Sequence, residues 1–245
     1  MKYITFSKRN IIEYLRNPLM LFFTLIFPLL MFVIFQIIKL GTGASNDIVP
    51  MFKITNLIPS ISVFSFSFLS LNLSTQISKD RTSSFQSRLQ VSPMKSFDFF
   101  LGYLLPSLLI SICQILLCFI IGFCFGLNIS INVLYTFLCL IIVSIFYISI
   151  GILIGSIFNE KGCGGISSIF INLTAIFSGM FFPLTNGIFK KILSYFPFLP
   201  SIAIPQSLLN NNYENFLLYF IVLIIYLVLI VSLSIFIFHK KLKNK

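Results

Sequence analysis

Long apolar runs recur along this chain, and each is close to 20 residues long. A run of that length, wound into an α-helix, is long enough to cross the hydrocarbon core of a bilayer. The mean hydropathy is +1.03, and only 9% of the residues are charged, against about 25% in a typical soluble domain. These features exclude a soluble globular protein and predict an all-α polytopic membrane protein.

The apolar runs divide into six expected spans, at residues 19–38, 54–77, 99–126, 131–157, 165–184 and 215–238. Six spans put both termini on the same side of the membrane. Of the 17 lysines and arginines, only Lys39, Lys53, Lys190 and Lys191 fall on the other side. Because basic residues accumulate in cytoplasmic segments, we expect both termini in the cytoplasm. We also expect residues 1–245 to form a single transmembrane domain.

Two segments outside the spans predict short helices at the membrane surface. Residues 7–17, SKRNIIEYLRN, form an amphipathic pattern that Ser7 can cap and that Pro18 follows. Such a helix lies in the interface plane rather than across it; a polar extension without structure is the alternative. Within residues 185–206, the piece NGIFKKILSYF (186–196) is too short to span and is apolar on one face with two lysines on the other, which predicts a short helix at the outer surface.

The second expected span is unusually polar. One arc at helical spacing holds Asn56, Ser60, Ser67, Ser70 and Ser74, and the nearly opposite arc holds Ser62, Ser65, Asn72 and Gln76. One interpretation is a surface that faces a substrate pathway. The other is helix packing, because small and hydroxyl residues let membrane helices approach and form hydrogen bonds. Both can hold, one on each arc.

Glycines in the fourth span and after it predict close packing and a turn. Gly151 and Gly155 have the small-xxx-small spacing that is typical of contacts between membrane helices. The stretch NEKGCGG, at residues 159–165, predicts a tight cytoplasmic turn between the fourth and fifth spans.

The sequence lacks the features of an enzyme or of a self-powered transporter. No segment outside the spans could form a soluble domain, and the phosphate-binding pattern G-x-x-x-x-G-K-[ST] is absent. The six acidic residues lie in loops or at span ends, whereas ion-driven transporters place coupling charges inside their spans. No catalytic constellation or metal-ligand spacing occurs. We therefore expect a membrane subunit that binds no cofactor itself and is driven by a partner.

Four segments resemble the ABC-2 type transporter permeases. The 7–17 helix resembles the elbow helix of that family, and DRTSSFQSRLQVSP (80–93) is similar to a stretch that ends in Leu-x-x-Ser/Thr-Pro. FFLGYLLP (99–106) is similar to the opening of its third span, and SGMFFPL (178–184) to the Ser-Gly-x-x-Phe-Pro signature that closes its fifth. Two positions depart from the pattern: Ser84–Phe85 replaces a frequent Gly-Thr, and Tyr103 a frequent basic residue. In this order, the segments cover essentially the whole chain.

The resemblance implies the membrane subunit of a bacterial ABC exporter in the cell membrane, whose cytoplasmic region 78–97 docks on a separate ATPase. The ATPase would use ATP and Mg²⁺. The residues agree, because Asp80 can cap a short helix that Pro93 ends, and Phe85 with Leu89 forms an apolar ridge beside two arginines. A helix held at the surface by anionic lipid is the alternative. The expected docking residues are Asp80, Arg81, Phe85, Arg88 and Leu89.

The same resemblance implies two ATPase copies, a second permease that is identical or homologous, and a pathway where the second and fifth spans meet. The expected cargo is hydrophobic or amphipathic, such as a drug, an antimicrobial peptide or a lipid, and no nucleic acid is expected. The candidate pathway residues are Asn56, Ser60, Ser67, Ser70, Ser74, Phe177, Phe181 and Phe182. Two alternatives remain: a membrane immunity or scaffold protein that does not transport, and a gradient-driven transporter, which the absence of intramembrane charge disfavours.

Overall fold

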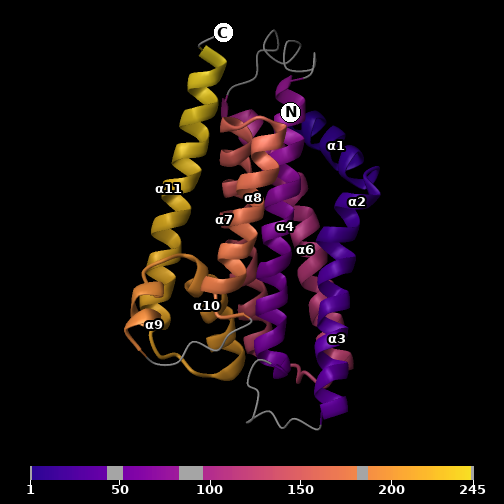
Figure 1. Cartoon of the computed structure of the whole chain (residues 1–245), viewed down its shortest axis with the longest axis vertical. Helices are drawn as coiled ribbons and strands as arrows, with labels where there is room; N and C mark the ends of the chain where they lie inside the picture. Colours follow the sequence, from indigo (N-terminus) through magenta and orange to yellow (C-terminus); the bar gives the residue numbers. More distant parts are fainter. Residues whose placement is uncertain (1, 43–51, 83–95, 181–186, 244–245) are drawn as a thin grey trace.

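The computed structural model describes residues 2–42, 52–82, 96–180 and 187–243, and all regular elements in these ranges are helical (Figure 1). The elements are α1 (Lys2–Leu15), α2 (Pro18–Leu21), the π-helix η1 (Phe22–Ile26), α3 (Phe27–Thr42), α4 (Ile54–Thr82), α6 (Ser96–Cys124), α7 (Ile131–Ile157), α8 (Glu160–Phe177), α9 (Ile188–Leu193), α10 (Phe198–Asn210) and α11 (Phe216–Lys243). The predicted all-α class is confirmed.

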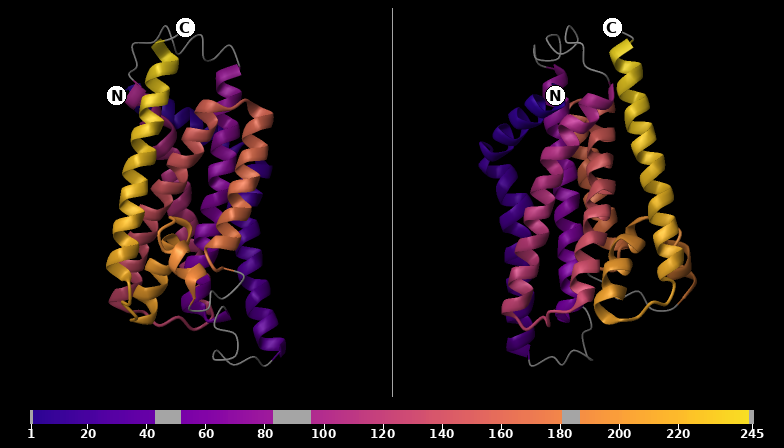
Figure 2. Two further views of the ribbon diagram at one scale, coloured as in Figure 1. Left: turned by 60° about the vertical axis from the view of Figure 1, so that its left-hand side comes forward. Right: turned by 180° about the vertical axis from the view of Figure 1, so that it is seen from behind.

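Helix α4 is the centre of the bundle. It packs against α7, α8, α6, α10 and α3. In the most apolar 18-residue stretch of α4, 72% of the residues are buried, whereas in that of α11 only 11% are. Figures 1 and 2 show α3 and α11 on opposite sides of the bundle. The polar second span is therefore the helix that the protein surrounds most completely.

Both ends of the described chain lie at one end of the bundle (Figure 1). The last turn of α4 and the first turn of α6 lie at this same end, which we call the termini end. Helices α9 and α10 lie at the opposite end. The two ends of the described chain therefore lie at one end of the bundle, and the side of the membrane that this end faces stays a prediction.

Five of the described helical stretches are long and apolar enough to cross a membrane: Pro18–Gly41, Ile54–Thr82, Phe97–Cys124, Ile131–Ile157 and Phe216–Ile237. They correspond to five of the six predicted spans. The prediction at 165–184 corresponds to α8, which runs from the termini end towards α9 and α10 (Figure 1) but is not among the five. Its first two turns contain Glu160, Lys161 and glycines, which lower its mean hydropathy.

The predicted tight turn at residues 159–165 is wrong. Helix α8 begins at Glu160, and the Asn159 side chain caps it by accepting a 2.9 Å hydrogen bond from the Gly162 backbone N–H. The three glycines of the stretch therefore lie inside the first turns of α8. The connection between α7 and α8 is therefore confined to Phe158 and Asn159.

The two predicted surface helices have different bounds from those expected. Helix α1 starts at Lys2 and ends at Leu15, and α2 follows with Asn17 as its cap and Pro18 in its first turn, where proline costs no hydrogen bond. The single short helix expected at 185–206 is instead two helices, α9 and α10. Helix α10 continues to Asn210, where Asn211 ends it in the left-handed conformation that asparagine tolerates.

Two glycines of α7 let its backbone approach the backbone of α4 closely. A methyl group at Gly151 would lie 2.7 Å from the Ser70 carbonyl oxygen, and one at Gly155 would lie 2.7 Å from that of Ser74. Any side chain larger than hydrogen would force the two backbones apart. The predicted packing role of these two glycines is confirmed.

Candidate functional site

A partly buried ionic cluster joins three helices at the termini end. The Arg9 guanidinium of α1 donates hydrogen bonds of 2.6 and 3.1 Å to the two carboxylate oxygens of Asp80, near the end of α4. The Tyr103 hydroxyl of α6 donates a 2.8 Å hydrogen bond to the same carboxylate. Asp80 is only 4% exposed and Tyr103 is 3% exposed. We call Arg9, Asp80 and Tyr103 the elbow brace.

Helix α1, the predicted elbow helix, also packs directly against α6. Gly102 has no side chain, so the Phe6 ring occupies the space where a Cβ would stand. The Gly102 carbonyl oxygen accepts a 3.0 Å hydrogen bond from Asn10 Nδ2 and a 3.4 Å bond from Ser7 Oγ. Phe6 packs edge-on against Tyr103, with ring centroids 4.9 Å apart. The brace is thus supported by packing that positions its arginine.

A second polar node fixes the chain where it enters the first span. Tyr14 of α1 shares a hydrogen bond with Thr24 Oγ1 in the π-helix η1. Asn72 Nδ2 of α4 donates a 2.9 Å bond to the same oxygen, and Ser65 Oγ donates a 2.6 Å bond to the Thr24 carbonyl. Burial raises the pKa of Tyr14 to about 12, so its hydroxyl keeps its proton at neutral pH. Ser65 and Asn72, on one predicted polar arc, therefore serve helix packing.

Of the predicted docking residues, Asp80 and Arg81 lie in the last turn of α4, and the other three follow the end of that helix. Asp80 cannot cap a new helix, because α4 continues to Thr82 and places Asp80 inside its last turn; that prediction was wrong. Arg81 donates hydrogen bonds of 2.8 and 3.2 Å to the backbone carbonyls of Gly155 and Phe158, at the end of α7. Phe85, Arg88 and Leu89 lie outside the described residues, so their docking role stays a prediction.

Three of the predicted pathway residues are buried between helices. Ser67, Ser70 and Ser74 have no exposed surface, and Ser74 Oγ lies 2.9 Å from Ser167 Oγ of α8. Helix packing is confirmed at these positions, and a pathway role for them stays a prediction. Phe177 is partly buried, with its ring centroid 6.3 Å from that of Phe198, while Phe181 and Phe182 lie outside the described residues.

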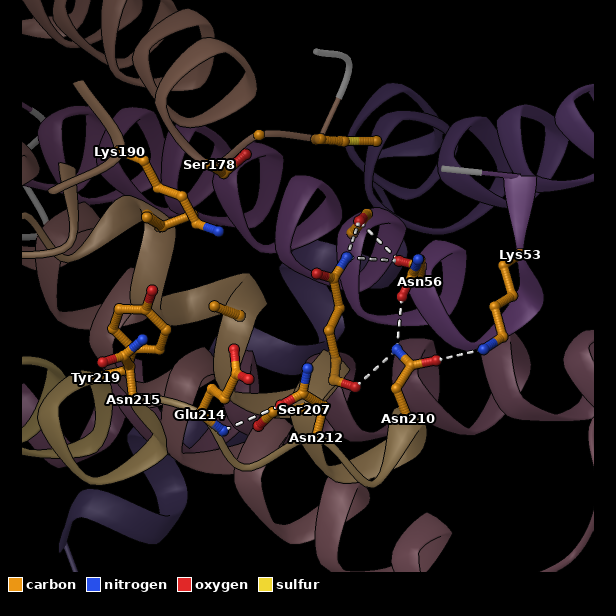
Figure 3. Close-up of a pocket in the computed structure, with 16 residues that line it drawn as sticks. Lys53, Asn56, Ser178, Lys190, Ser207, Asn210, Asn212, Glu214, Asn215 and Tyr219 are labelled. Atoms are coloured by element: carbon orange, nitrogen blue, oxygen red, sulfur yellow. Dashed lines mark hydrogen bonds between the residues drawn. The ribbon is translucent and has the colours of Figure 1, made fainter. Parts of the chain in front are cut away.

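The other two predicted pathway residues, Asn56 and Ser60, line a cavity at the end of the bundle opposite the termini. The cavity has a volume of about 550 Å³ and lies between the first turns of α4, the α9–α10 segment and the start of α11 (Figure 3). Its lining includes five carboxamides (Asn56, Gln206, Asn210, Asn212 and Asn215), two lysines, one glutamate and one tyrosine. We call it the amide pocket.

The wall of the amide pocket is a hydrogen-bond network between α4 and α10. Asn210 Nδ2 donates a 2.7 Å bond to Asn56 Oδ1, and Asn210 Oδ1 accepts a 2.8 Å bond from Lys53 Nζ. Gln206 Nε2 donates 3.2 Å bonds to the Asn56 carbonyl and to Ser60 Oγ. Figure 3 shows Lys53, Asn56 and Asn210 as one connected group.

Most of the amide pocket was missed from the sequence. Gln206 and Asn210 were not among the predicted site residues, although the stretch NNNYEN at residues 210–215 is conspicuously polar in this apolar chain. That cluster of carboxamides beside a predicted span was the available signal. In the described ranges, no three His, Cys, Asp or Glu side chains gather as a metal site would require.

Comparison with protein families identifies the chain. Residues 50–236 match the model of a family described as "ABC-2 family transporter protein". A comparison with curated proteins gave no match. The matched range covers most of the chain and includes every helix from α4 to the greater part of α11. The protein therefore belongs to the ABC-2 transporter family, as a membrane component that lacks the catalytic ATPase domain.

Proposed function

We propose that this chain is the permease subunit of an ATP-driven exporter, which moves a hydrophobic or amphipathic cargo outward across a bacterial cell membrane. In this proposal the termini end faces the cytoplasm, and a separate ATPase docks on region 78–97. That ATPase binds and hydrolyses ATP with Mg²⁺. The family to which the chain belongs supports the need for such a partner.

The observation that carries the proposal is the elbow brace. Region 78–97 begins in α4 and ends in α6, and Asp80 and Tyr103 belong to those two helices. Arg9 and Tyr103 bind the same carboxylate, so the two helices and the elbow helix are tied at one point. A force applied to the segment between α4 and α6 would reach all three helices together.

The charge of the brace is maintained in spite of its burial. Burial alone would lower the pKa of Arg9, but its hydrogen bond to Asp80 and the charges of Asp80 and Glu13 outweigh that effect and raise it. Arg9 therefore stays cationic. A charged, bidentate contact of this kind is directional, which suits it to transmit the position of one helix to another.

The full assembly in this proposal contains two ATPase copies and a second permease, identical or homologous to this one. Helix α8 would complete six passes in each permease, and the second and fifth passes would meet at the seam that carries cargo. Drug resistance, self-immunity and export of a product are all compatible with such a transporter.

The test is a docking variant with a matched control. Phe85→Ala combined with Leu89→Ala removes the proposed apolar ridge, whereas Phe236→Ala removes an exposed phenylalanine near the termini end of α11. We expect the double variant to reach the membrane in normal amount but to lose both ATPase co-purification and transport. The Phe236 variant should retain both. Normal co-purification by the double variant would contradict the docking proposal.

A non-transporting immunity or scaffold protein is distinguished by the ATPase itself. The ATPase that co-purifies with the chain, or one encoded by a neighbouring gene, is inactivated by replacing its phosphate-binding lysine. An exporter would then lose its biological effect. A protein that acts only by binding a toxin would keep it. Protection that survives inactivation of the ATPase would therefore overturn the exporter proposal.

A further inference from the structure

The amide pocket has the size of a site for a small ligand. Its volume of about 550 Å³ falls within the range of about 300–1,000 Å³ that small-molecule sites occupy. It lies at the end of the bundle away from the elbow brace, where the proposed exporter would release or hold its cargo.

The wall is preorganised and keeps hydrogen-bonding capacity for a ligand. The two bonds from Gln206 Nε2 fix the orientation of that carboxamide and leave its Oε1 oxygen to accept another bond. Asn212 Oδ1 accepts a 3.1 Å bond from the Glu214 backbone N–H, which leaves the Asn212 amino group to donate. Fixed carboxamides that offer both a donor and an acceptor match the N–H and C=O groups of a peptide backbone.

Ser178 provides an independent sign of a missing partner. Its side chain is 2% exposed and lines the pocket, and its Oγ has no hydrogen-bond partner in the part of the chain that the structure describes. Buried hydroxyl groups in proteins are nearly always bonded. Figure 3 shows Ser178 across the pocket from the residues that follow α10. A ligand in the pocket would satisfy this oxygen.

The pocket also carries both signs of charge. Lys53 and Glu214 lie on different sides of Asn210 and Asn212 in Figure 3. Among described residues, Lys53 contacts the neutral Asn210 amide, and Glu214 takes part in no salt bridge. Lys190 adds a second cation to the lining. A neutral ligand would displace water from these charged groups without giving them an ionic partner. A zwitterion would give each of them a partner of opposite charge.

We propose that the amide pocket binds a short zwitterionic peptide segment, with its ammonium group at Glu214, its carboxylate at Lys53 and its backbone amides on Gln206, Asn212 and Ser178. This inference rests on the proposed function and deepens it, because it names peptide as the class of cargo. A neutral oligosaccharide matches less well: Tyr219, the aromatic residue of the lining, is 7% exposed and offers little ring face for a sugar to stack on.

The test measures binding of defined probes to the purified permease assembly in lipid nanodiscs by isothermal titration calorimetry. The probes are tetraalanine, its N-acetylated form, its C-amidated form and the neutral trisaccharide maltotriose. We expect tetraalanine to bind most tightly. Glu214→Gln should weaken tetraalanine but leave the acetylated form unaffected, and Lys53→Gln should weaken only the probes with a free carboxylate.

Ser178→Ala should weaken all three peptide probes by about fivefold, the effect of one lost hydrogen bond. Its matched control is Ser168→Ala, an exposed serine of α8 whose hydroxyl bonds the Gly164 carbonyl, and Lys161→Gln serves the same purpose for Lys53. The controls should bind every probe as the unmodified protein does. No peptide binding, equal affinities in the pocket variants, or preferential binding of maltotriose would each overturn the inference.

The two proposals can fail separately. If tetraalanine does not bind but the ATPase still co-purifies and drives transport, the peptide inference is wrong and the exporter proposal stands. If tetraalanine binds with the expected variant pattern but no ATPase is required, the exporter proposal is wrong and the binding site remains.

Discussion

Arg9 binds Asp80 through two hydrogen bonds, although 70 residues separate them in the chain. Tyr103 of α6 donates a third hydrogen bond to the same carboxylate, and Arg9 of α1 supplies the positive charge. The arginine of α1 and the tyrosine of α6 are thus two parts of one interaction.

Asp80→Asn should weaken the attachment of the elbow helix, because it removes the charge that holds Arg9. We expect a loss of about 1–3 kcal/mol in stability, less than for a fully buried pair because 34% of the Arg9 side chain is exposed. Thermal unfolding in detergent, followed by circular dichroism, measures it. Adding Arg9→Gln should restore part of the loss, since the unpaired cation is then absent.

The control for this prediction is Glu13→Gln. Glu13 also contacts Arg9, at 2.8 Å, but its side chain is 42% exposed, so its removal should change stability by less than about 1 kcal/mol. Equal losses for the Asp80 and Glu13 variants would show that the brace is not the stronger contact.

Tyr14→Phe should cost about 1 kcal/mol at neutral pH, because it removes the hydroxyl that bonds Thr24. The folded pKa of about 12 lies above the ordinary value of about 10. Because the folded pKa is raised, the hydroxyl stabilises fully below pH 10, and this contribution is lost as the pH rises towards 12. Comparing unfolding temperatures of the two proteins across that interval should show their difference shrinking. A constant difference would contradict the assignment.

Gly151→Ala should destabilise the bundle although alanine favours helices. The new methyl group would lie 2.7 Å from the Ser70 carbonyl oxygen, and overpacking of this kind costs about 1–3 kcal/mol. Gly164→Ala is the matched control, because nothing lies within 4 Å of its Cβ position, and it should gain about 0.5–1 kcal/mol. Both are measured by thermal unfolding. A stabilising Gly151 variant would show that α4 and α7 are not in tight contact.

Cysteine labelling tests the orientation of the protein. Lys161→Cys lies at the termini end and Lys191→Cys at the other, both exposed, in a background where the exposed Cys113 and Cys124 are replaced by alanine. A membrane-impermeant maleimide should label the Lys191 variant in intact cells. The Lys161 variant should be labelled only after permeabilisation. The reverse pattern would place the termini outside.

The class of this protein and the positions of its five long apolar helices were predictable from the sequence. In a bilayer, each crossing segment must satisfy its own backbone hydrogen bonds, so an apolar run of sufficient length is a helix whatever its neighbours are. That rule located five helices long and apolar enough to span, and the small-xxx-small spacing separately located the packing glycines of α7. The turn predicted from the glycines of residues 159–165 was wrong, because the Asn159 cap starts α8 at Glu160 and the glycines lie inside that helix.

The sequence by itself determined an all-helical membrane protein, because the hydropathy and the length of an apolar run are local properties that the bilayer converts directly into helices. Only the tertiary structure decided that Asp80 pairs with Arg9, that Ser70 packs against α7, and that Asn56 joins Gln206 in a pocket. The physical reason is that these pairings depend on which faces of distant helices meet. A polar residue on a span predicts that a partner is needed, but the packing of the whole bundle selects the partner.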